Sequence, residues 1–208
     1  MELEQLDYFC TPIYLTKNEE LLPIVKQIAL DNLKNSPEPN EIYPVRMSTN
    51  MLLDQRIGDF AEFIGKTTWG ILDSQGFNLD GFDISITELW CQEHWRTSSM
   101  DQHIHANGNH IVGFYFLDVP ENAPPAIFYD PRPSRLMVDL PQRDEAKVTH
   151  SSTLINIRPE AGLLIFAPAW LAHSFARNIS REPFRFVHFN LTAQPKLNQP
   201  VCEAAEVI

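Results

Sequence analysis

Cysteine is scarce in this chain, and its scarcity excludes two kinds of site. The sequence holds three cysteines, Cys10, Cys91 and Cys202, which are widely spaced and form no Cys-x-x-Cys pair. An odd number of isolated thiols favours neither a disulfide framework nor a cysteine zinc site. We therefore expect ordinary reduced thiols, and a metal site would need other side chains.

Basic residues are also few. The chain has 16 Lys and Arg against 27 Asp and Glu, so its formal net charge is −11. Binding to nucleic acid or to an anionic membrane needs clustered Lys and Arg, and the composition argues against both kinds of partner. An anionic ligand would have to be met by a local basic group.

Long apolar runs are missing as well. No run approaches the roughly 20 residues needed to cross a bilayer, and the acidic start of the chain, residues 1–4, does not resemble a signal peptide. We expect a cytoplasmic protein. The 208 residues, 44% of them hydrophobic, suffice for one domain with a substantial core.

Helical and strand patterns occupy different parts of the chain. Residues 9–15 read as a first strand, and apolar spacing predicts helices over 21–33 and 57–72, the second ending near Gly76. From Phe82 onward, short β-rich runs alternate with turn residues, which is typical of an antiparallel sandwich or barrel. The expected strands are 82–95, 111–117, 126–129, 153–157, 163–166, 174–176 and 184–191.

The domain organisation expected from this pattern is a single domain in three parts. Residues 1–79 supply a strand and helices that pack on a barrel, residues 80–193 form the β core, and residues 194–208 form a tail. The longest loop, 131–152, has the length of a lid or a binding loop.

Histidines supply the strongest functional signal. His103 and His105 are two residues apart, so on an extended strand both imidazoles project from one face, and His173 could complete a metal site from a neighbouring strand. Asp101 is the nearest carboxylate that could join them, although a solvated turn acid is as good an interpretation. A lone histidine in a strand is usually structural, and we interpret His94, His110, His150 and His188 in that way.

Arg185 lies twelve residues beyond His173, in an alternating strand. Its planar guanidinium suits a carboxylate in two-point contact, whereas the plainer interpretation is a surface arginine paired with Glu182. Alternation puts Arg185, Val187 and Phe189 on one face and the residues between them on the other. The pattern alone does not decide which face is buried.

The ordered motifs from about residue 80 to 192 resemble the 2-oxoglutarate and Fe(II)-dependent oxygenases, more narrowly a bacterial and phage group with His-x-His. The segments that carry the resemblance are 103–105, 113–117 with 119–120, 129–132, 159–166 with 168–173, and Arg185 with 189–190. The resemblance implies a double-stranded β-helix, or cupin-like jelly roll, with iron at its open end.

The resemblance also implies roles for single residues. His103 and His173 match the metal histidines, and His105 stands where most of the superfamily has Asp or Glu. Arg185 matches the basic residue that holds the distal carboxylate of 2-oxoglutarate. Secondary roles fall to three others: Tyr115 and Asn190 as co-substrate contacts and Arg132 as a contact to substrate or a brace for the loop.

The leading hypothesis is a dioxygenase that binds Fe(II) and couples oxidative decarboxylation of 2-oxoglutarate to hydroxylation of a small-molecule or peptidyl substrate, with release of succinate and CO2. Its partners would be 2-oxoglutarate, dioxygen and that substrate, and a homodimer is one arrangement left open. Two alternatives remain: a three-histidine zinc hydrolase or lyase, which lacks an evident general base, and a non-catalytic cupin-like binding protein. The second would show Arg185 turned to solvent and His105 away from His173.

Overall fold

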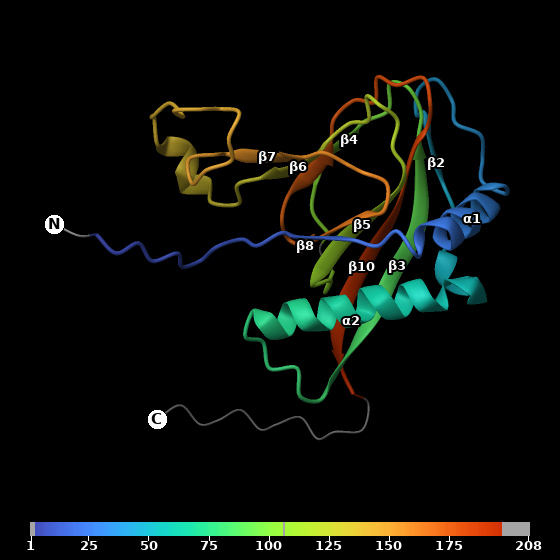
Figure 1. Ribbon diagram of the computed structural model, residues 1–208, viewed down its shortest axis with the longest axis horizontal. Helices are drawn as coiled ribbons and strands as arrows, with labels where there is room; N and C mark the ends of the chain where they lie inside the picture. Colours follow the sequence, from blue (N-terminus) through green and yellow to red (C-terminus); the bar gives the residue numbers. More distant parts are fainter. Residues whose placement is uncertain (1–2, 106, 197–208) are drawn as a thin grey trace.

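A computed structural model describes residues 3–105 and 107–196 and shows two antiparallel β-sheets (Figure 1). The larger sheet has six strands in the order β1-β8-β5-β10-β3-β2, and the smaller has four in the order β4-β9-β6-β7. In that order the larger sheet comprises β1 (Tyr14–Lys17), β8 (Leu163–Pro168), β5 (Ile111–Asp118), β10 (Phe184–Pro195), β3 (Phe82–His94) and β2 (Val45–Met47). The smaller comprises β4 (Met100–His103), β9 (His173–Phe175), β6 (Ala126–Tyr129) and β7 (Leu154–Ile157).

Aromatic side chains fill the space between the two sheets. Phe175 of β9 stacks on Phe186 of β10 with ring centroids 4.8 Å apart, and Phe114 of β5 meets Phe175 edge to face at 5.2 Å. Such pairs add to the free energy gained by burying the rings themselves. The core therefore joins the sheets into one β-sandwich.

Two helices cover the opposite face of the larger sheet. Helix α1 (Leu22–Leu33) and helix α2 (Gly58–Ser74) bury one stripe each, and Figure 1 shows α2 crossing β3 and β10. Phe60 of α2 stacks on Tyr115 of β5 at 5.0 Å, in the same core cluster as Val187 and Phe189. Short 3-10 turns complete the helical content: η1 (Met51–Leu53), η2 (Gln55–Ile57) and η3 (Pro133–Met137).

The predicted mainly β architecture with N-terminal helices is confirmed, and the arrangement is a double-stranded β-helix. Both helices and seven of the strands lie close to their predicted places. The first strand is shifted, because 9–13 has no strand structure and β1 begins at Tyr14. Strands β2 and β4 were not predicted, since three or four residues are too few to show a period.

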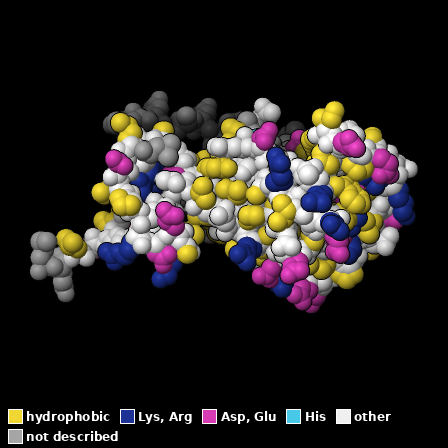
Figure 2. Space-filling view, turned by 90° about the horizontal axis from the view of Figure 1, so that it is seen from above, with side chains coloured by type: hydrophobic (Ala, Val, Ile, Leu, Met, Phe, Trp, Pro, Cys, Tyr) yellow, Lys and Arg dark blue, Asp and Glu magenta, His cyan; other side chains and the backbone are white. Residues whose placement is uncertain are grey.

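The connection between β6 and β7 forms a lobe at the side of the sandwich, with η3 inside it (Figure 1). Figure 2 shows this lobe standing apart from the body, and on that face acidic and basic side chains are interspersed with apolar ones rather than gathered into a basic area. Within the described part of the chain, no helix is long and apolar enough to span a membrane.

The predicted tail, residues 194–208, starts inside a strand. Strand β10 continues to Pro195, which pairs with Phe82 at the beginning of β3. The rest of the predicted tail, residues 197–208, lies outside the described residues.

Candidate metal centre

Three histidines converge at one end of the smaller sheet. β4 ends at His103 and β9 begins at His173, and these two residues are direct partners across the strand pair. His105 follows the end of β4, where its backbone N–H donates to the carbonyl of Ala169 at 2.8 Å. One ligand atom from each imidazole lies within 4.8 Å of the others, so the three could hold one metal ion.

Backbone carbonyls fix the tautomers of two of these rings. Nδ1 of His103 lies 2.7 Å from the carbonyl oxygen of Asp101, and Nδ1 of His173 lies 2.9 Å from that of Leu171. A carbonyl can only accept, so each Nδ1 must carry the proton, and each Nε2 is left with its lone pair. Metal-binding histidines are held in this way in known sites.

Asn190 of β10 holds the third ring. Its Nδ2 lies 3.0 Å from Nδ1 of His105 and also contacts the carboxylate of Glu88 on β3. Nε2 of His105 and of His173 are buried and have no hydrogen-bond partner. Buried polar atoms are normally satisfied, so these two nitrogens fit a bound cation.

Burial keeps His105 and His173 neutral. Desolvation lowers the pKa of His173 to about 4, and desolvation together with the neighbouring His103 lowers that of His105 to about 4. A neutral imidazole is the form that binds metal.

A cavity of about 310 Å³ opens beside His103 and His105. A fourth histidine, His188 of β10, is 1% exposed in this cavity and packs between His105 and Trp90, with ring centroids at 4.7 and 4.6 Å. Burial lowers its pKa well below the ordinary value. The sequence alone suggests a structural role for His188, whereas the structure places it in the lining of this cavity. His188 and Asn190 are two residues apart on β10 and share one face of the strand. That spacing is the signal in the sequence that could have placed His188 at the site.

The structure does not bring Arg185 and Tyr115 to the histidines. Arg185 faces the helical side of the sheet, where its Nε donates to Glu93 at 2.6 Å and its Nη1 donates to Asp118 at 2.9 Å. The Tyr115 hydroxyl lies on the same side and donates to the carbonyl of Asn18 at 2.6 Å. Arg185 lies two residues before Val187 on β10, and Tyr115 is the direct partner of Val187 on β5. The side chains of all three therefore project from the helical face of the sheet, away from the cavity. The predicted contact of either with a co-substrate at the histidines does not agree with this geometry.

The side chains of Asp101 and Arg132 are not part of the histidine cluster either. Asp101 lines the cavity but has an exposed side chain, and it is not among the grouped ligand atoms. Arg132 braces the start of the lobe, because its Nε and Nη2 donate to the carboxylate of Asp130 at 2.9 and 2.8 Å. This two-point bond lowers the pKa of Asp130.

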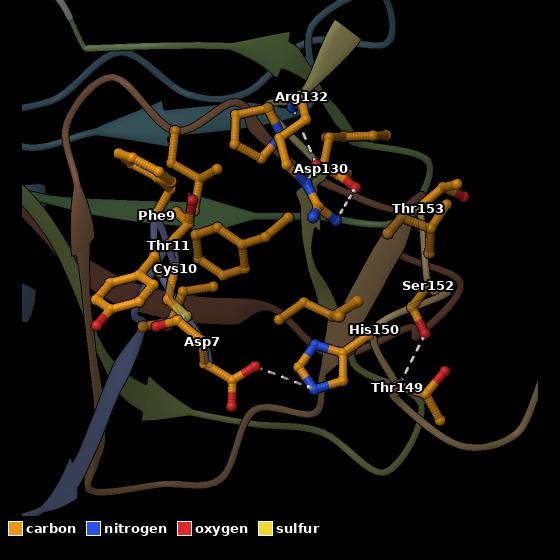
Figure 3. Close-up of a pocket in the computed structure, with 18 of the residues that line it drawn as sticks. Asp7, Phe9, Cys10, Thr11, Asp130, Arg132, Thr149, His150, Ser152 and Thr153 are labelled. Carbon is orange, nitrogen blue, oxygen red and sulfur yellow. Dashed lines mark hydrogen bonds and ion pairs between the residues drawn. The ribbon is translucent and has the colours of Figure 1, made fainter. Parts of the chain in front are cut away.

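A second cavity, of about 480 Å³, lies between the N-terminal segment and the base of the lobe (Figure 3). His150 and Asp7 face each other across it with a 3.9 Å ion-pair distance, and the Arg132–Asp130 pair stands at its rim. None of the three clustered histidines lines this cavity. Phe128, which does line it, lies 5.8 Å from the His173 ring and separates the cavity from the cluster.

One family model matches the central part of the chain. Residues 88–190 match the family model described as "Putative 2OG-Fe(II) oxygenase". No curated protein matches the sequence.

Solved structures share the fold at low identity. An α-ketoglutarate-dependent epimerase, SnoN from nogalamycin biosynthesis, is 14% identical with a TM-score of 0.62, covering 93% of this chain and 81% of its own. A Pseudomonas putida prolyl-4-hydroxylase is 8% identical with a TM-score of 0.58, covering 88% and 92%. HygX from Streptomyces hygroscopicus, solved with nickel and 2-oxoglutarate, is 10% identical with a TM-score of 0.58, covering 90% and 84%.

The matched segment begins at Glu88 and ends at Asn190, so it contains all three clustered histidines as well as the two residues that hold His105 in place. Through residues 88–190 the chain therefore belongs to the 2OG-Fe(II) oxygenase family, and it is a 2-oxoglutarate-dependent dioxygenase that uses Fe(II).

Proposed function

We propose that His103, His105 and His173 hold the iron through Nε2, and that the enzyme uses dioxygen to hydroxylate a small-molecule or peptidyl substrate in the cytoplasm, with release of succinate and CO2. The observation that carries the proposal is the convergence of the three imidazoles, two of them with buried Nε2 atoms that have no hydrogen-bond partner. Three protein ligands leave positions for a chelating co-substrate.

The chain's own residues prepare the site in three ways. The carbonyls of Asp101 and Leu171 set the tautomers of His103 and His173, and Asn190 holds the His105 ring. The aromatic core beneath the cluster excludes water, since Phe114 lies 5.3 Å from the His173 ring. When bound, Fe(II) supplies the oxidative chemistry, which belongs to the cofactor rather than to the side chains.

The two alternative hypotheses fit the geometry less well. A non-catalytic binding protein would hold His105 away from His173, yet their rings are stacked at 5.1 Å. A zinc hydrolase would need a general base near the bound water. The neutral imidazole of His188 lines the cavity and could act as that base, but residues 88–190 match an Fe(II) oxygenase family model rather than a zinc enzyme.

The test is an anaerobic titration of metal-free protein with Fe(II) and then with 2-oxoglutarate, followed by the weak visible absorption of the chelate. We expect His103→Ala and His173→Ala to abolish the band and the oxygen-dependent formation of succinate. His150→Ala is a matched control, because this exposed histidine lies at the other cavity and should bind iron normally. Iron binding that survives in His173→Ala would contradict the assigned ligands, and a band that never forms would contradict the function.

A further inference from the structure

Trp90 and His188 form a pair of unused hydrogen-bonding groups beside the metal site. They are direct partners across β3 and β10, and their rings lie 4.6 Å apart. Nε1 of Trp90 and both ring nitrogens of His188 are buried and have no hydrogen-bond partner in the described part of the chain. Leaving such atoms unsatisfied costs free energy, so a cluster of them calls for a specific explanation.

The cavity that these groups line contains no cationic side chain to receive an anion. Its described lining has neither Lys nor Arg, and its one carboxylate, that of Asp101, is exposed to solvent. Arg185 is unavailable, since its guanidinium is held by Glu93 and Asp118 on the other face of the sheet. An anionic group that enters this cavity must therefore be bound by neutral donors.

The two rings lie side by side, next to the proposed metal ligands. His188 packs against His105 at 4.7 Å on one side and against Trp90 on the other, so the line of rings leads away from the proposed ligands into the cavity. A neutral imidazole has one N–H to donate, and the indole has another. Two donors are what the two oxygens of one carboxylate need.

We propose that Trp90 Nε1 and His188 bind the carboxylate of 2-oxoglutarate that is remote from the metal, in place of an arginine. The inference rests on the proposed function, because it assumes that the keto-acid end is anchored at the three histidines. It makes Trp90 and His188 the residues that select a dicarboxylate over a monocarboxylic 2-oxo acid.

The test compares two ligands on metal-loaded protein without oxygen. 2-Oxopentanoate keeps the chelating end of 2-oxoglutarate and lacks the remote carboxylate, so the ratio of the two dissociation constants reports on that carboxylate alone. Trp90→Phe and His188→Phe keep an aromatic ring in each place and remove the donors. Each should weaken 2-oxoglutarate by about tenfold, the usual effect of losing a hydrogen bond to a charged group, and leave 2-oxopentanoate unchanged.

Arg185→Gln is the matched control on the same strand, and we expect it to change neither dissociation constant. If it weakens 2-oxoglutarate while the two aromatic variants do not, the inference is wrong and Arg185 regains the role suggested by its sequence position. Equal weakening of both ligands in Trp90→Phe and His188→Phe would also overturn it, because that result reports a disturbed metal site.

A direct measurement on the unmodified enzyme is independent of how the variants fold. In zinc-loaded protein the indole N–H resonance of Trp90, identified by its absence in Trp90→Phe, should move downfield with 2-oxoglutarate and stay in place with 2-oxopentanoate. A resonance unmoved by bound 2-oxoglutarate would overturn the inference and leave the proposed function standing. Failure of the unmodified protein to bind metal or 2-oxoglutarate at all would overturn both.

Discussion

At the scale of single residues, His105 differs from the other two proposed ligands. The rings of His103 and His173 are hydrogen-bonded to backbone carbonyls. The ring of His105 is instead hydrogen-bonded to the side chain of Asn190, which also contacts Glu88. Binding of a metal through Nε2 leaves the proton of His105 on Nδ1. Nδ2 of Asn190 faces both His105 and Glu88 and can only donate, so Oδ1, which has no hydrogen-bond partner, accepts that proton only if the amide turns over and gives up its bond to Glu88.

Asn190→Ala should therefore weaken iron binding without removing a ligand. Partners behind metal-binding histidines are typically worth about 10- to 100-fold in metal affinity, and we expect a loss in that range. The measurement is an anaerobic Fe(II) titration beside Ser85→Ala, a control at the far end of the same strand pair, where the Ser85 hydroxyl donates to Gln194 at 3.2 Å. An affinity equal to that of the control would show that Asn190 does not position His105.

The spacing of the histidines was enough to predict the cluster, but the role predicted for Arg185 depended on which face of β10 is inside. Apolar residues occupy both faces, with Phe186 between the sheets and Phe189 against the helices. Alternation therefore separated Arg185 from His188 correctly and could not say which of them lines the cavity. That choice is made by where the helices pack, which is a long-range property.

At the scale of elements, β5 shows how the larger sheet admits bulky neighbours. A Cβ on Gly113 would lie 2.0 Å from Cε2 of Phe189 and 2.8 Å from the carbonyl oxygen of Ile165. The absence of a side chain lets the Phe189 ring lie directly over the strand. Phe189 in turn packs on Phe60 of α2, so this glycine connects the sheet to its helical layer.

Gly113→Ala should lower the free energy of unfolding by about 3 kcal/mol, because neither the ring nor the backbone can move aside cheaply. Gly65→Ala in α2 is the matched control. Nothing lies within 4 Å of the added carbon there, and replacing a helical glycine should stabilise the protein by about 0.5 to 1 kcal/mol. Urea denaturation of both variants measures the difference. Similar small changes in the two would show that the strand is not tightly packed at Gly113.

Charged side chains join the elements on the helical face of the larger sheet. Glu93 of β3 accepts from Arg185 of β10 and lies 3.5 Å from Arg46 of β2, while Asp118 of β5 contacts Arg185 and Lys26 of α1. Glu93 is 2% exposed, so this network holds a buried charge that each partner helps to compensate. The sequence suggested Glu182 as a partner of Arg185 because it is close along the chain. The actual partners, Glu93 and Asp118, lie on other strands, and pairing across strands leaves no local sequence pattern.

At the scale of the whole molecule, the candidate site occupies the junction between the sheets, where the protein buries several histidines. Burial lowers the pKa of His94 and of His173 to about 4, and these residues are 3% and 1% exposed. The fold thus contains neutral imidazoles that the unfolded chain would protonate near pH 6.5. The architecture was predictable from the strand pattern and motif order. The depth at which each histidine is buried depends on how the two sheets and their loops meet, which local periodicity does not report.

The stability of the metal-free protein should consequently fall with pH. Four histidines have a folded-state pKa below the unfolded value: His94, His105, His173 and His188. Their contribution is fully present above about pH 6.5 and is lost as the pH falls toward 4. Each group changes the free energy of unfolding by at most about 1.4 kcal/mol per pH unit, and the four together give a loss of about 4 to 8 kcal/mol between pH 7.5 and 5. Carboxyl groups act in a lower range, since the pKa of Asp31, lowered by Lys34 and Arg56, is about 2 and its ordinary value is 3.8.

Urea denaturation at several pH values between 7.5 and 5 measures this loss. His94 lies outside the proposed ligand set, and its Nε2 lies 2.9 Å from Oε1 of Gln92. His94→Gln should make the protein less stable at pH 7.5 and should reduce the slope of stability against pH by about a quarter, because one of the four histidines whose pKa is lowered is gone. A slope that is the same in the variant would show that His94 is not the source, and stability that rises as the pH falls would contradict the burial of neutral histidines at this junction.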